Sequence, residues 1–309
     1  MKEKAPEILV ILGPTASGKT MLACHAASEL NGEIISADSR QVYRNMNIGT
    51  GKDLSEYDVR GKKIPHHLID IRDAGYKYNI AEFEADFVDA LEAIKLRNNV
   101  PILCGGSGLY IEAALKGNSL IGIPANRVYQ DELESKLDSY VYERFSSIAP
   151  ELQNLLAADT KRRRVRAIEI DEFLKSHPEW KTEQRKPPNA KIFGIDVDRI
   201  VRRNCISNRL QQRMKTGLIE EVEDLLKNSI TEKDLDYYGL EYKWVGQFIA
   251  GKVSKDEMIL KLEIAIHQFA KRQMTWFRGM QRRGFEITWV AENLSLEEKV
   301  NLIVDGYKI

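Results

Sequence analysis

A phosphate-binding loop set between a strand and a helix constrains this chain more than any other feature. Residues 13–20 read Gly-Pro-Thr-Ala-Ser-Gly-Lys-Thr and match the pattern G-x-x-x-x-G-K-[ST] without a mismatch. An apolar run at residues 7–12 precedes the loop, and a helical stretch at 20–30 follows it. In such a turn, backbone amides and the helix N-terminus bind an anion. We therefore predict that this loop holds the phosphates of a small-molecule substrate.

Each residue of the loop has an expected part in this binding. The glycines let the backbone amides turn toward one point, Lys19 adds a positive charge, and Thr20 offers a hydroxyl to Mg²⁺. Thr20 is thus the predicted metal ligand. The predicted phosphate-binding residues are Gly13, Pro14, Thr15, Ala16, Ser17, Gly18, Lys19 and Thr20.

Apolar strands alternate with helical stretches around this loop. The strand candidates lie at residues 7–12, 33–38, 67–71, 100–104 and 191–196. Near-continuous apolar strands that alternate with helices are typical of a mainly parallel sheet covered on both faces. The sequence therefore predicts an α/β fold, with a P-loop NTPase-like sheet flanked by helices. Ligands of such sheets collect at the carboxyl ends of the strands, where Asp38 and residues 105–107 also lie.

The middle of the chain follows a different pattern. Between residues 118 and 188 we find helical periodicity, best at 129–142 and 161–174, and no convincing strand. We therefore predict a helical insertion at residues 119–189. The catalytic core is then formed by residues 1–118 and 190–309, with helices expected at 79–97, 204–214, 218–226 and 254–279.

Bulk properties exclude several classes of protein. The 46 basic residues balance the 46 acidic ones, so any polyanionic partner must be recognised by local clusters of charge. The three cysteines, Cys24, Cys104 and Cys205, are isolated, which argues against a disulfide framework or a zinc site. No apolar run approaches the ~18 residues of a membrane span, and no signal peptide precedes the first strand. We expect a cytoplasmic enzyme that does not bind membranes.

Further motifs narrow the reaction. They are residues 36–43 (Ser-Ala-Asp-Ser-Arg-Gln-Val-Tyr), 48–52 (Ile-Gly-Thr-Gly-Lys), 65–70 (Pro-His-His-Leu-Ile-Asp), 105–110 (Gly-Gly-Ser-Gly-Leu-Tyr), 163–169 and 270–278 (Ala-Lys-Arg-Gln-Met-Thr-Trp-Phe-Arg). With the phosphate-binding loop they resemble the bacterial tRNA dimethylallyltransferase family, in that family's order, from about residue 8 to residue 279.

The resemblance implies a reaction and its partners. The family transfers a dimethylallyl group from dimethylallyl diphosphate to N6 of the adenine at position 37, 3′ to the tRNA anticodon, and releases diphosphate. It implies Mg²⁺ as cofactor, the tRNA anticodon stem-loop as a partner of the helical insertion, and a monomer.

Four residues are expected to carry the chemistry. Lys19 would offset the negative charge that grows on the leaving diphosphate. Asp38 is assigned as the base for the weakly nucleophilic adenine amine, although it could instead cap a turn or bind Mg²⁺. Ser107 would lie beside that amine, or only shape its Gly-rich turn. Arg209 matches a family arginine near the diphosphate, with a plain surface position as the alternative.

The resemblance also implies contacts with tRNA. The enzyme must take the target base out of its stack, and polar side chains after Asp38 suit that task. The run at 161–166 is the densest basic cluster and favours phosphate contact over a merely solvated face. The predicted tRNA-binding residues are Asp38, Ser39, Arg40, Gln41, Ser107, Arg162, Arg163, Arg166 and Arg278.

The chain departs from the family pattern at three places. Ser107 stands where the family usually has Thr, Cys205 stands where it often has Arg, and residues 158–161 replace a His-Pro-Asn-Asp-like lead-in. Arg163, Arg166 and Glu169 still align. These departures leave open how tightly the hydroxyl at 107 packs and which contacts the loop before residue 161 makes.

Three other hypotheses about the function remain. An adenylate isopentenyltransferase would do the same chemistry on a smaller acceptor, but would not need the insertion or its Arg-rich helix. A P-loop kinase for a small metabolite would not explain residues 270–278. A non-catalytic tRNA-binding module would not need Lys19, Thr20 and Asp38 together.

Overall fold

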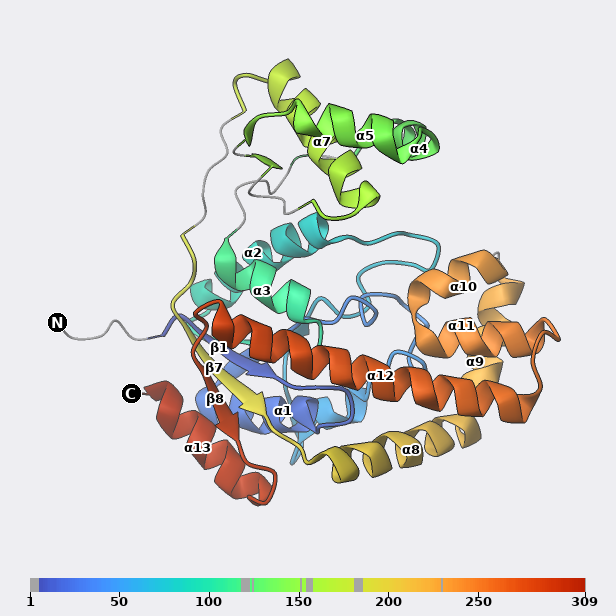
Figure 1. Cartoon of the computed structure of the whole chain (residues 1–309). Coiled ribbons are helices and arrows are strands. Elements are labelled where there is room, and N and C mark those ends of the chain that lie inside the picture. Colours follow the sequence, from blue (N-terminus) through green and yellow to red (C-terminus); the bar gives the residue numbers. More distant parts are fainter. Residues whose placement is uncertain are drawn as a thin grey trace. The chain divides into compact units, whose positions relative to one another are not determined.

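The computed structural model describes residues 6–117, 123, 125–150, 152–153, 158–180, 186–228 and 230–308. The chain divides into two compact units, one formed by Met1–Gly117 with Lys186–Ile309 and the other by Asn118–Arg185. Figure 1 shows the chain with its elements labelled. The first unit contains the phosphate-binding loop and the sheet, so it is treated first.

The first unit is built on a six-stranded parallel sheet, as predicted. Its order is β5-β2-β6-β1-β7-β8. The strands are β1 (Ile8–Leu12), β2 (Gly32–Ser36), β5 (His66–His67), β6 (Val100–Gly105), β7 (Ala190–Ile195) and β8 (Ile287–Val290). The chain leaves β1 toward β2 and later returns to β1's other side through β7, so the order reverses at β1. Ligands of such sheets bind outside the carboxyl ends of the strands at this reversal.

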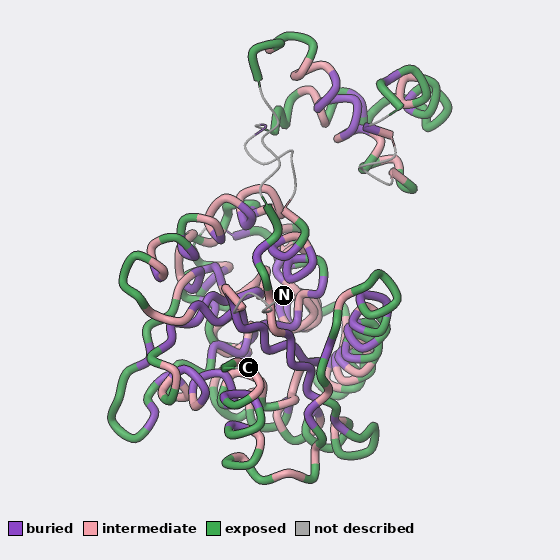
Figure 2. The backbone as a smooth tube through the Cα atoms, turned by 90° about the vertical axis from the view of Figure 1, so that its left-hand side faces the viewer, coloured by how far each residue is buried: buried purple, intermediate pink, exposed green. Residues whose placement is uncertain are grey.

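Helices cover both faces of the sheet. In β1, Leu9 and Ile11 pack with α1 (Lys19–Leu30) and α13 (Leu296–Lys308) on one face. Ile8, Val10 and Leu12 face α2 (Ile80–Leu96), α3 (Gly108–Lys116) and α12 (Lys255–Arg282) on the other. Figure 1 shows β1, β7 and β8 between α12 and the pair α1 and α13, and Figure 2 shows the buried strands at the centre. Burial on both faces explains why these strands read as continuous apolar runs.

Shorter elements surround the carboxyl end of the sheet. A two-stranded hairpin, β3 (Asp58–Val59) with β4 (Lys62–Lys63), follows a 3-10 turn at Leu54–Tyr57. The remaining helices of this unit are α8 (Arg199–Lys215), α9 (Leu218–Lys227), α10 (Glu232–Tyr238) and α11 (Leu240–Ile249). The periodicity predicted α2, α8, α9 and α12, but α3, α10, α11, α13 and β8 were not predicted.

The predicted strand at 67–71 is wrong beyond its first residue. β5 ends at His67, because Leu68 and Asp70 both take positive φ angles of 62° and 56°. Such a backbone leaves the extended region and breaks a strand ladder. The turn carries the Asp70 carboxylate to the buried ammonium of Lys52. His67 contacts the Glu33 carboxylate through Nε2.

The unit Asn118–Arg185 is helical in its described residues. Its helices are α4 (Arg127–Ser135), α5 (Asp138–Ser146) and α7 (Lys161–Ser176), which share a small core around Leu133, Val141 and Ile168. The single helix predicted at 129–142 is therefore wrong, because Lys136 and Leu137 are extended. The Lys161 ammonium donates to the carbonyls of Glu134 and Lys136 and so stabilises the end of α4. Within the described residues of the chain, no helix is long and apolar enough to cross a membrane.

Glu33 ties three segments at the amino-terminal end of the sheet, and we expect Glu33→Gln to be destabilising. The carboxylate accepts hydrogen bonds from Arg97 and Asn99 and contacts His67. The Arg97 hydrogen bonds lower the pKa of Glu33 to about 2, against the opposing effect of burial. The substitution should lower the free energy of unfolding by roughly 2–3 kcal/mol at about pH 7.

The pH dependence of this effect has a definite sign. A carboxylate whose pKa is depressed by folding stabilises the protein above its unfolded-state pKa of about 4.5. The difference between parent and variant should therefore shrink as the pH falls from about 4.5 toward about 2. Denaturant unfolding at about pH 7 and about pH 3.5 measures it, with Glu29→Gln on exposed α1 surface as the control. An equal loss at both pH values would contradict the assignment.

Candidate active site

Three neighbouring strands end at one edge of the sheet and deliver the predicted site residues there. β1 leads into the loop at 13–18, β2 into residues 37–41, and β6 into Gly106 and Ser107. The two later loops touch, because the Ser107 amide donates to the Ala37 carbonyl at 3.3 Å. A Cβ on Gly105 would lie 2.3 Å from that carbonyl oxygen, so this approach requires glycine.

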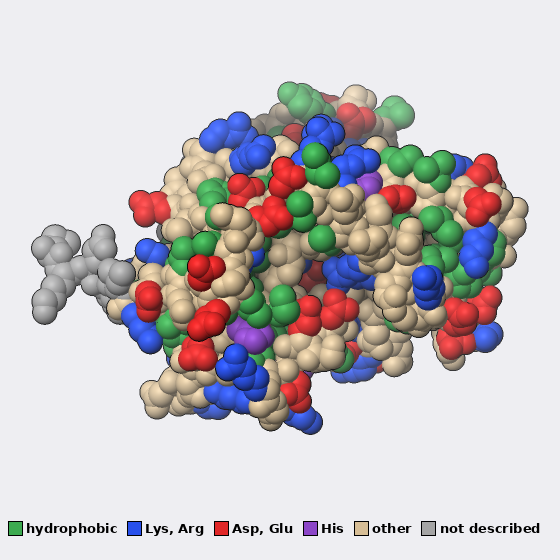
Figure 3. Space-filling view, turned by 90° about the horizontal axis from the view of Figure 1, so that it is seen from below, with side chains coloured by type: hydrophobic (Ala, Val, Ile, Leu, Met, Phe, Trp, Pro, Cys, Tyr) green, Lys and Arg blue, Asp and Glu red, His purple; other side chains and the backbone are tan. Residues whose placement is uncertain are grey.

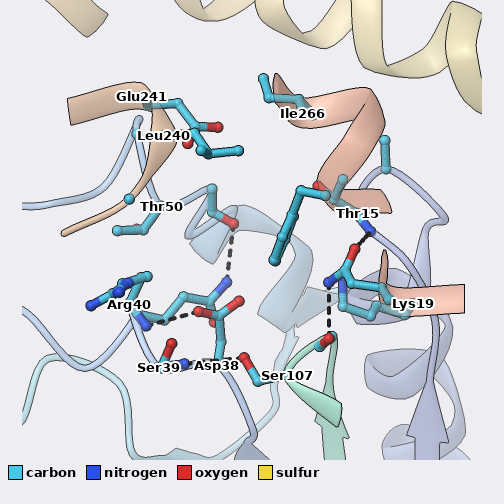
Figure 4. Close-up of a pocket in the computed structure, with 18 of the residues that line it drawn as sticks. Thr15, Lys19, Asp38, Ser39, Arg40, Thr50, Ser107, Leu240, Glu241 and Ile266 are labelled. Carbon is cyan, nitrogen blue, oxygen red and sulfur yellow. Dashed lines mark hydrogen bonds between the residues drawn. The ribbon is translucent and has the colours of Figure 1, made fainter. Parts of the chain in front are cut away.

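A cavity of about 740 Å³ opens over these loops. Figure 4 shows it in close-up, with Lys19, Asp38 and Ser107 below and Leu240, Glu241 and Ile266 above. Its walls come from the loop ends, from α8 and from α11 and α12. The lining includes Thr15, Ala16, Ser17, Gly18, Lys19, Thr20, Asp38, Ser39, Arg40, Gln41, Gly106, Ser107, Arg209, Arg213, Gln273 and Trp276. The predicted base and hydroxyl residues and the phosphate-binding residues 15–20 are thus brought together in one cavity, within one unit of the chain, whereas Gly13 and Pro14 do not line it.

The phosphate-binding loop has the geometry of an anion cradle. Gly18 stands directly before α1 with φ 73°, a conformation that favours glycine. The Ser17 hydroxyl is shielded from solvent and, among the described residues, lacks a hydrogen-bond partner. Burial lowers the pKa of the Lys19 ammonium, and Arg209 adds to this effect, while the carboxylates of Asp38 and Glu56 oppose it. An unsatisfied hydroxyl and a buried cation at a helix N-terminus fit a bound diphosphate.

Gln273, which lies in the motif at 270–278 but was assigned no role from the sequence, joins the two halves of the site. From α12 its Oε1 accepts the Thr15 amide at 2.8 Å, and its Nε2 donates to the Gly106 carbonyl at 2.9 Å. Both bonds appear as dashed lines in Figure 4. The side chain is buried, so the two bonds are shielded from water. The loop that holds phosphate and the loop that carries Ser107 are therefore fixed to each other through one amide.

Gln273→Glu should keep the bond to Thr15 but remove the bond to Gly106, and should reduce turnover roughly 10- to 100-fold. A carboxylate still accepts the Thr15 amide but places an acceptor opposite the Gly106 carbonyl, which pushes the Ser107 loop away. The measurement is steady-state kinetics with each substrate, together with thermal unfolding. Gln281→Glu is the matched control, because Gln281 lies on the same helix and serves only as an acceptor, from Trp289 Nε1. Equal turnover in the two variants would show that the Gly106 bond is dispensable.

Asp38 and the residues after it form a turn at the rim of the cavity. The Asp38 carboxylate accepts the Arg40 amide at 2.9 Å through Oδ1, and the Ser39 amide reaches Ser107 Oγ at 3.5 Å. The Arg40 bond is the turn-capping contact that the sequence offered as an alternative role for Asp38. It engages only one of the two carboxylate oxygens, Oδ1. Arg40 lies over the Tyr237 ring at 4.7 Å, and Figure 4 shows its guanidinium at the edge of the cavity.

The loop opposite Asp38 is held by a carboxylate that sequence reasoning missed. Glu221 on α9 accepts three consecutive amides, those of Asn47, Ile48 and Gly49, at 2.7–2.9 Å, and also the Tyr242 hydroxyl at 2.8 Å. Two residues on, the Gly51 carbonyl accepts Nε2 of Gln41 at 3.2 Å. This chain of bonds gives residues 48–52 and their motif a structural purpose, which is to support the turn that carries Asp38.

Two acidic residues and Arg209 extend the site beside Lys19. Arg209 Nη2 lies 2.6 Å from the Asp53 carboxylate. Burial raises the pKa of Glu56, with Asp53 adding to the effect and Arg209 and Lys19 opposing it. The predicted arginine thus lines the cavity and is neutralised by Asp53 rather than lying on open surface.

Thr20 can serve as the protein ligand of a magnesium ion. It lines the cavity beside Lys19 at the start of α1. In the described part of the chain, no three His, Cys, Asp or Glu side chains gather at metal-binding distance. Mg²⁺ needs no such cage, because it is commonly held by one or two protein oxygens together with substrate phosphates and waters. A hydroxyl next to a phosphate cradle fits that ion.

The other predicted tRNA contacts are not among the residues that line this cavity. Arg162 and Arg163 are exposed on α7, where Arg163 pairs with Asp159 at 2.5 Å. Arg166 instead bonds within its own unit, to buried Glu169 and to the Ile123 carbonyl. Arg278 is exposed on α12 and does not line the cavity. On the face that Figure 3 shows, acidic and basic side chains are interspersed.

Comparisons with known proteins agree with this site. A family model described as IPP transferase matches residues 41–280, and one described as isopentenyl transferase matches residues 6–64. The chain is 51% identical over 307 residues to tRNA dimethylallyltransferase 2 of Bacteroides fragilis, covering 98% of each chain. It is also 51% identical to tRNA dimethylallyltransferase 1 of Parabacteroides distasonis, covering 96% of each.

Solved structures give the same answer. The crystal structure of a tRNA isopentenylpyrophosphate transferase from Bacillus halodurans has a TM-score of 0.70 at 32% identity, covering 97% of each chain. A eukaryotic dimethylallyltransferase acting on tRNA shares the fold, with a TM-score of 0.74 at 22% identity over 92% of this chain and 73% of that one. The resemblance drawn from the motifs is confirmed, and the chain belongs to the bacterial tRNA dimethylallyltransferase family.

Proposed function

We propose that this protein transfers a dimethylallyl group from dimethylallyl diphosphate to N6 of the adenine at position 37 of tRNA and releases diphosphate. The observation that carries the proposal is the shared cavity, in which a phosphate cradle faces the Asp38 carboxylate and the Ser107 hydroxyl. The name of the Bacteroides fragilis relative supports the reaction class.

The phosphate side of the cavity suits the leaving group. As the bond between C1 of the allyl group and the diphosphate oxygen breaks, negative charge grows on diphosphate. Lys19, the loop amides and the Ser17 hydroxyl are positioned to bind that charge, with Arg209 beside them. We propose that the Thr20 hydroxyl holds Mg²⁺ there, an ion that supplies further positive charge to the diphosphate.

The opposite side suits the nucleophile. A new bond forms between N6 and C1, and the amine must lose a proton to become the product. Asp38 has one carboxylate oxygen engaged by the Arg40 amide and is assigned to accept that proton. The Ser107 hydroxyl lies against the same turn, 3.5 Å from the Ser39 amide, and would orient the amine. Gln273 keeps this side in register with the phosphate cradle.

We propose that the exposed arginines of α7, Arg162 and Arg163, bind tRNA phosphates, and that residues 38–41 contact bases near the target. Arg163→Ala should weaken tRNA affinity and reduce the slope of log K against log salt by about 1. Filter binding of unmodified tRNA over a range of salt concentrations measures both. The KM for dimethylallyl diphosphate should stay unchanged. A variant with parental tRNA affinity at every salt concentration would remove Arg163 from the binding surface.

We further propose that the enzyme acts as a monomer in the cytoplasm. The described residues that line the cavity all come from one compact unit, which supports a site that is complete within one chain. Sedimentation at working concentration, with and without tRNA, tests the monomer, and a dimer that dissociates together with activity would refute it.

The first experiment incubates the purified protein with Mg²⁺, labelled dimethylallyl diphosphate, and either unmodified tRNA or AMP. We expect label in tRNA alone, located at position 37 by nuclease mapping. Label in AMP alone would instead establish the nucleotide-acceptor reaction. AMP is included because residues 6–64 match a family model described as isopentenyl transferase. Label in neither acceptor would reject the proposed function.

A further inference from the structure

Helix α8 presents one face to the cavity, and two arginines lie on it one turn apart. Residues 205, 209 and 213 all line the cavity, which their spacing of four along a helix explains. Arg209 was expected from the sequence, whereas Arg213 was not. The Arg213 side chain is the less accessible of the two, with 13% of its surface exposed against 30% for Arg209.

The two guanidinium groups converge on a single backbone position. A Cβ placed on Gly51 would lie 2.1 Å from Nη2 of Arg213 and 2.6 Å from Nη2 of Arg209. Gly51 has φ 67° and carries no side chain, so it leaves room for both groups. Burial lowers the pKa of Arg213. The positive charge of Arg209 lowers it further, because like charges held this close repel.

Each arginine has its own carboxylate partner. Arg209 Nη2 bonds Asp53 at 2.6 Å, and Arg213 Nη1 bonds Glu241 on α11 at 2.9 Å. Glu241 is partly buried, with 16% of its side chain exposed, and burial raises its pKa while Arg213 opposes that rise. A guanidinium carries five N–H donors in a rigid fork, so one bond to Glu241 leaves most of the fork of Arg213 for another acceptor.

The pair also adjoins the phosphate cradle. Thr15, Ala16, Arg209, Arg213 and Glu241 line the cavity together, and the same five residues also bound a small pocket of about 10 Å³. A multiply charged anion that leaves the cradle on this side therefore meets two forked cations. A diphosphate has several terminal oxygens, and forked guanidinium groups match such oxygens in pairs.

We propose that Arg209 and Arg213 act as one binding pair for the departing diphosphate, and that Glu241 holds Arg213 in place for it. Arg213 is then a second arginine ligand of the leaving group. The inference deepens the proposed function and rests on it, since diphosphate is the product of that reaction. Binding of inorganic diphosphate can nevertheless be measured without any transfer to tRNA.

The test compares variants in a background where Glu241 is neutral. Glu241→Gln removes the carboxylate charge but keeps an oxygen that can accept the Arg213 bond, so Arg213 stays charged and held. Glu241→Gln with Arg213→Met also removes the cation without stranding an acid. Titration calorimetry with inorganic diphosphate and Mg²⁺ should give parental or tighter binding for the first. It should give roughly 10- to 100-fold weaker binding for the second. Lys215→Met, which removes an exposed charge from the same helix, controls for net charge.

A conservative variant keeps the test decisive if the double variant fails to fold. Arg213→Lys retains the charge beside Glu241 but lacks the fork, and should weaken diphosphate binding several-fold while leaving the KM for tRNA unchanged. Diphosphate binding by folded Arg213→Met/Glu241→Gln that equals binding by Glu241→Gln would overturn the pair. So would a loss in Lys215→Met as large as the loss in Arg213→Lys. Wild-type protein that binds diphosphate through Arg213 but modifies no tRNA would reject the proposed function and keep the pair.

Discussion

Lys19→Ala should abolish dimethylallyl transfer, with turnover at least roughly 10³-fold below that of the parent protein. The ammonium lies inside the phosphate cradle at the start of α1, where burial lowers its pKa and little water competes for its charge. Charge that develops on the leaving diphosphate would lose its nearest cation from the protein. Because the electrostatic effect acts on the bond-breaking step, kcat should fall more than affinity for tRNA.

The measurement is single-turnover transfer of labelled dimethylallyl group to tRNA, with thermal unfolding as the test of folding. Lys62→Ala, on the exposed β4 hairpin, removes one positive charge outside the cavity and serves as the control. Lys19→Arg keeps the charge but changes its shape, so it should retain a small part of the activity. Turnover within about threefold of the parent value in Lys19→Ala would remove Lys19 from the mechanism.

The sheet and the phosphate cradle could be predicted because local sequence determines them. β1 is buried on both faces, so its five residues Ile8–Leu12 are all apolar and stand out as a strand. The loop that follows needs glycine at residue 18 for its positive φ and a cation at Lys19, which makes it readable as a motif. Asp38 and Ser107 were placed correctly near it because parallel strands end on the same edge of a sheet.

The supports of the site could not be predicted, because they join residues far apart in sequence. Gln273 lies 258 residues from Thr15, and Glu221 lies 174 residues from Asn47. The motif at 270–278 contains Gln273, but nothing local in the sequence indicates which loops Gln273 or Glu221 would contact. β8 was missed for a related reason, since a strand of four residues at the edge of a sheet carries too few buried positions to read as an apolar run.

The basic run at 161–166 shows the limit of reading charge from sequence. Its arginines lie close together in the chain, but the structure gives them different surroundings. Arg163 remains exposed, whereas Arg166 bonds Glu169 and a backbone carbonyl within the small core. Glu169 is buried, so removing Arg166 would take away its cationic partner and destabilise the unit, even though Asn126 and Gln130 still donate to it. Mutational tests of tRNA binding therefore belong at Arg162 and Arg163.

Asp38→Asn should reduce turnover by roughly 10²- to 10⁴-fold and leave the KM for dimethylallyl diphosphate nearly unchanged. The amide retains an oxygen that can accept the Arg40 amide, so the turn at residues 38–41 should keep its shape. What is lost is the capacity to take a proton from N6 as the bond to carbon forms. If Asp38 only capped the turn, Asp38→Asn would keep that cap and turnover would stay near the parent value.

The remaining alternative is that Asp38 acts through Mg²⁺, and kinetics can separate the two roles. If Asp38 binds the ion, raising the Mg²⁺ concentration should restore the activity of Asp38→Asn. If Asp38 is the base, activity stays low at every Mg²⁺ concentration, and the acidic limb of the pH–rate profile disappears. The geometry favours the base, because Asp38 caps the turn that contacts Ser107, which follows β6, while Thr20 lies at the start of α1. Rescue by Mg²⁺ with an unaltered profile would transfer Asp38 from proton transfer to metal binding.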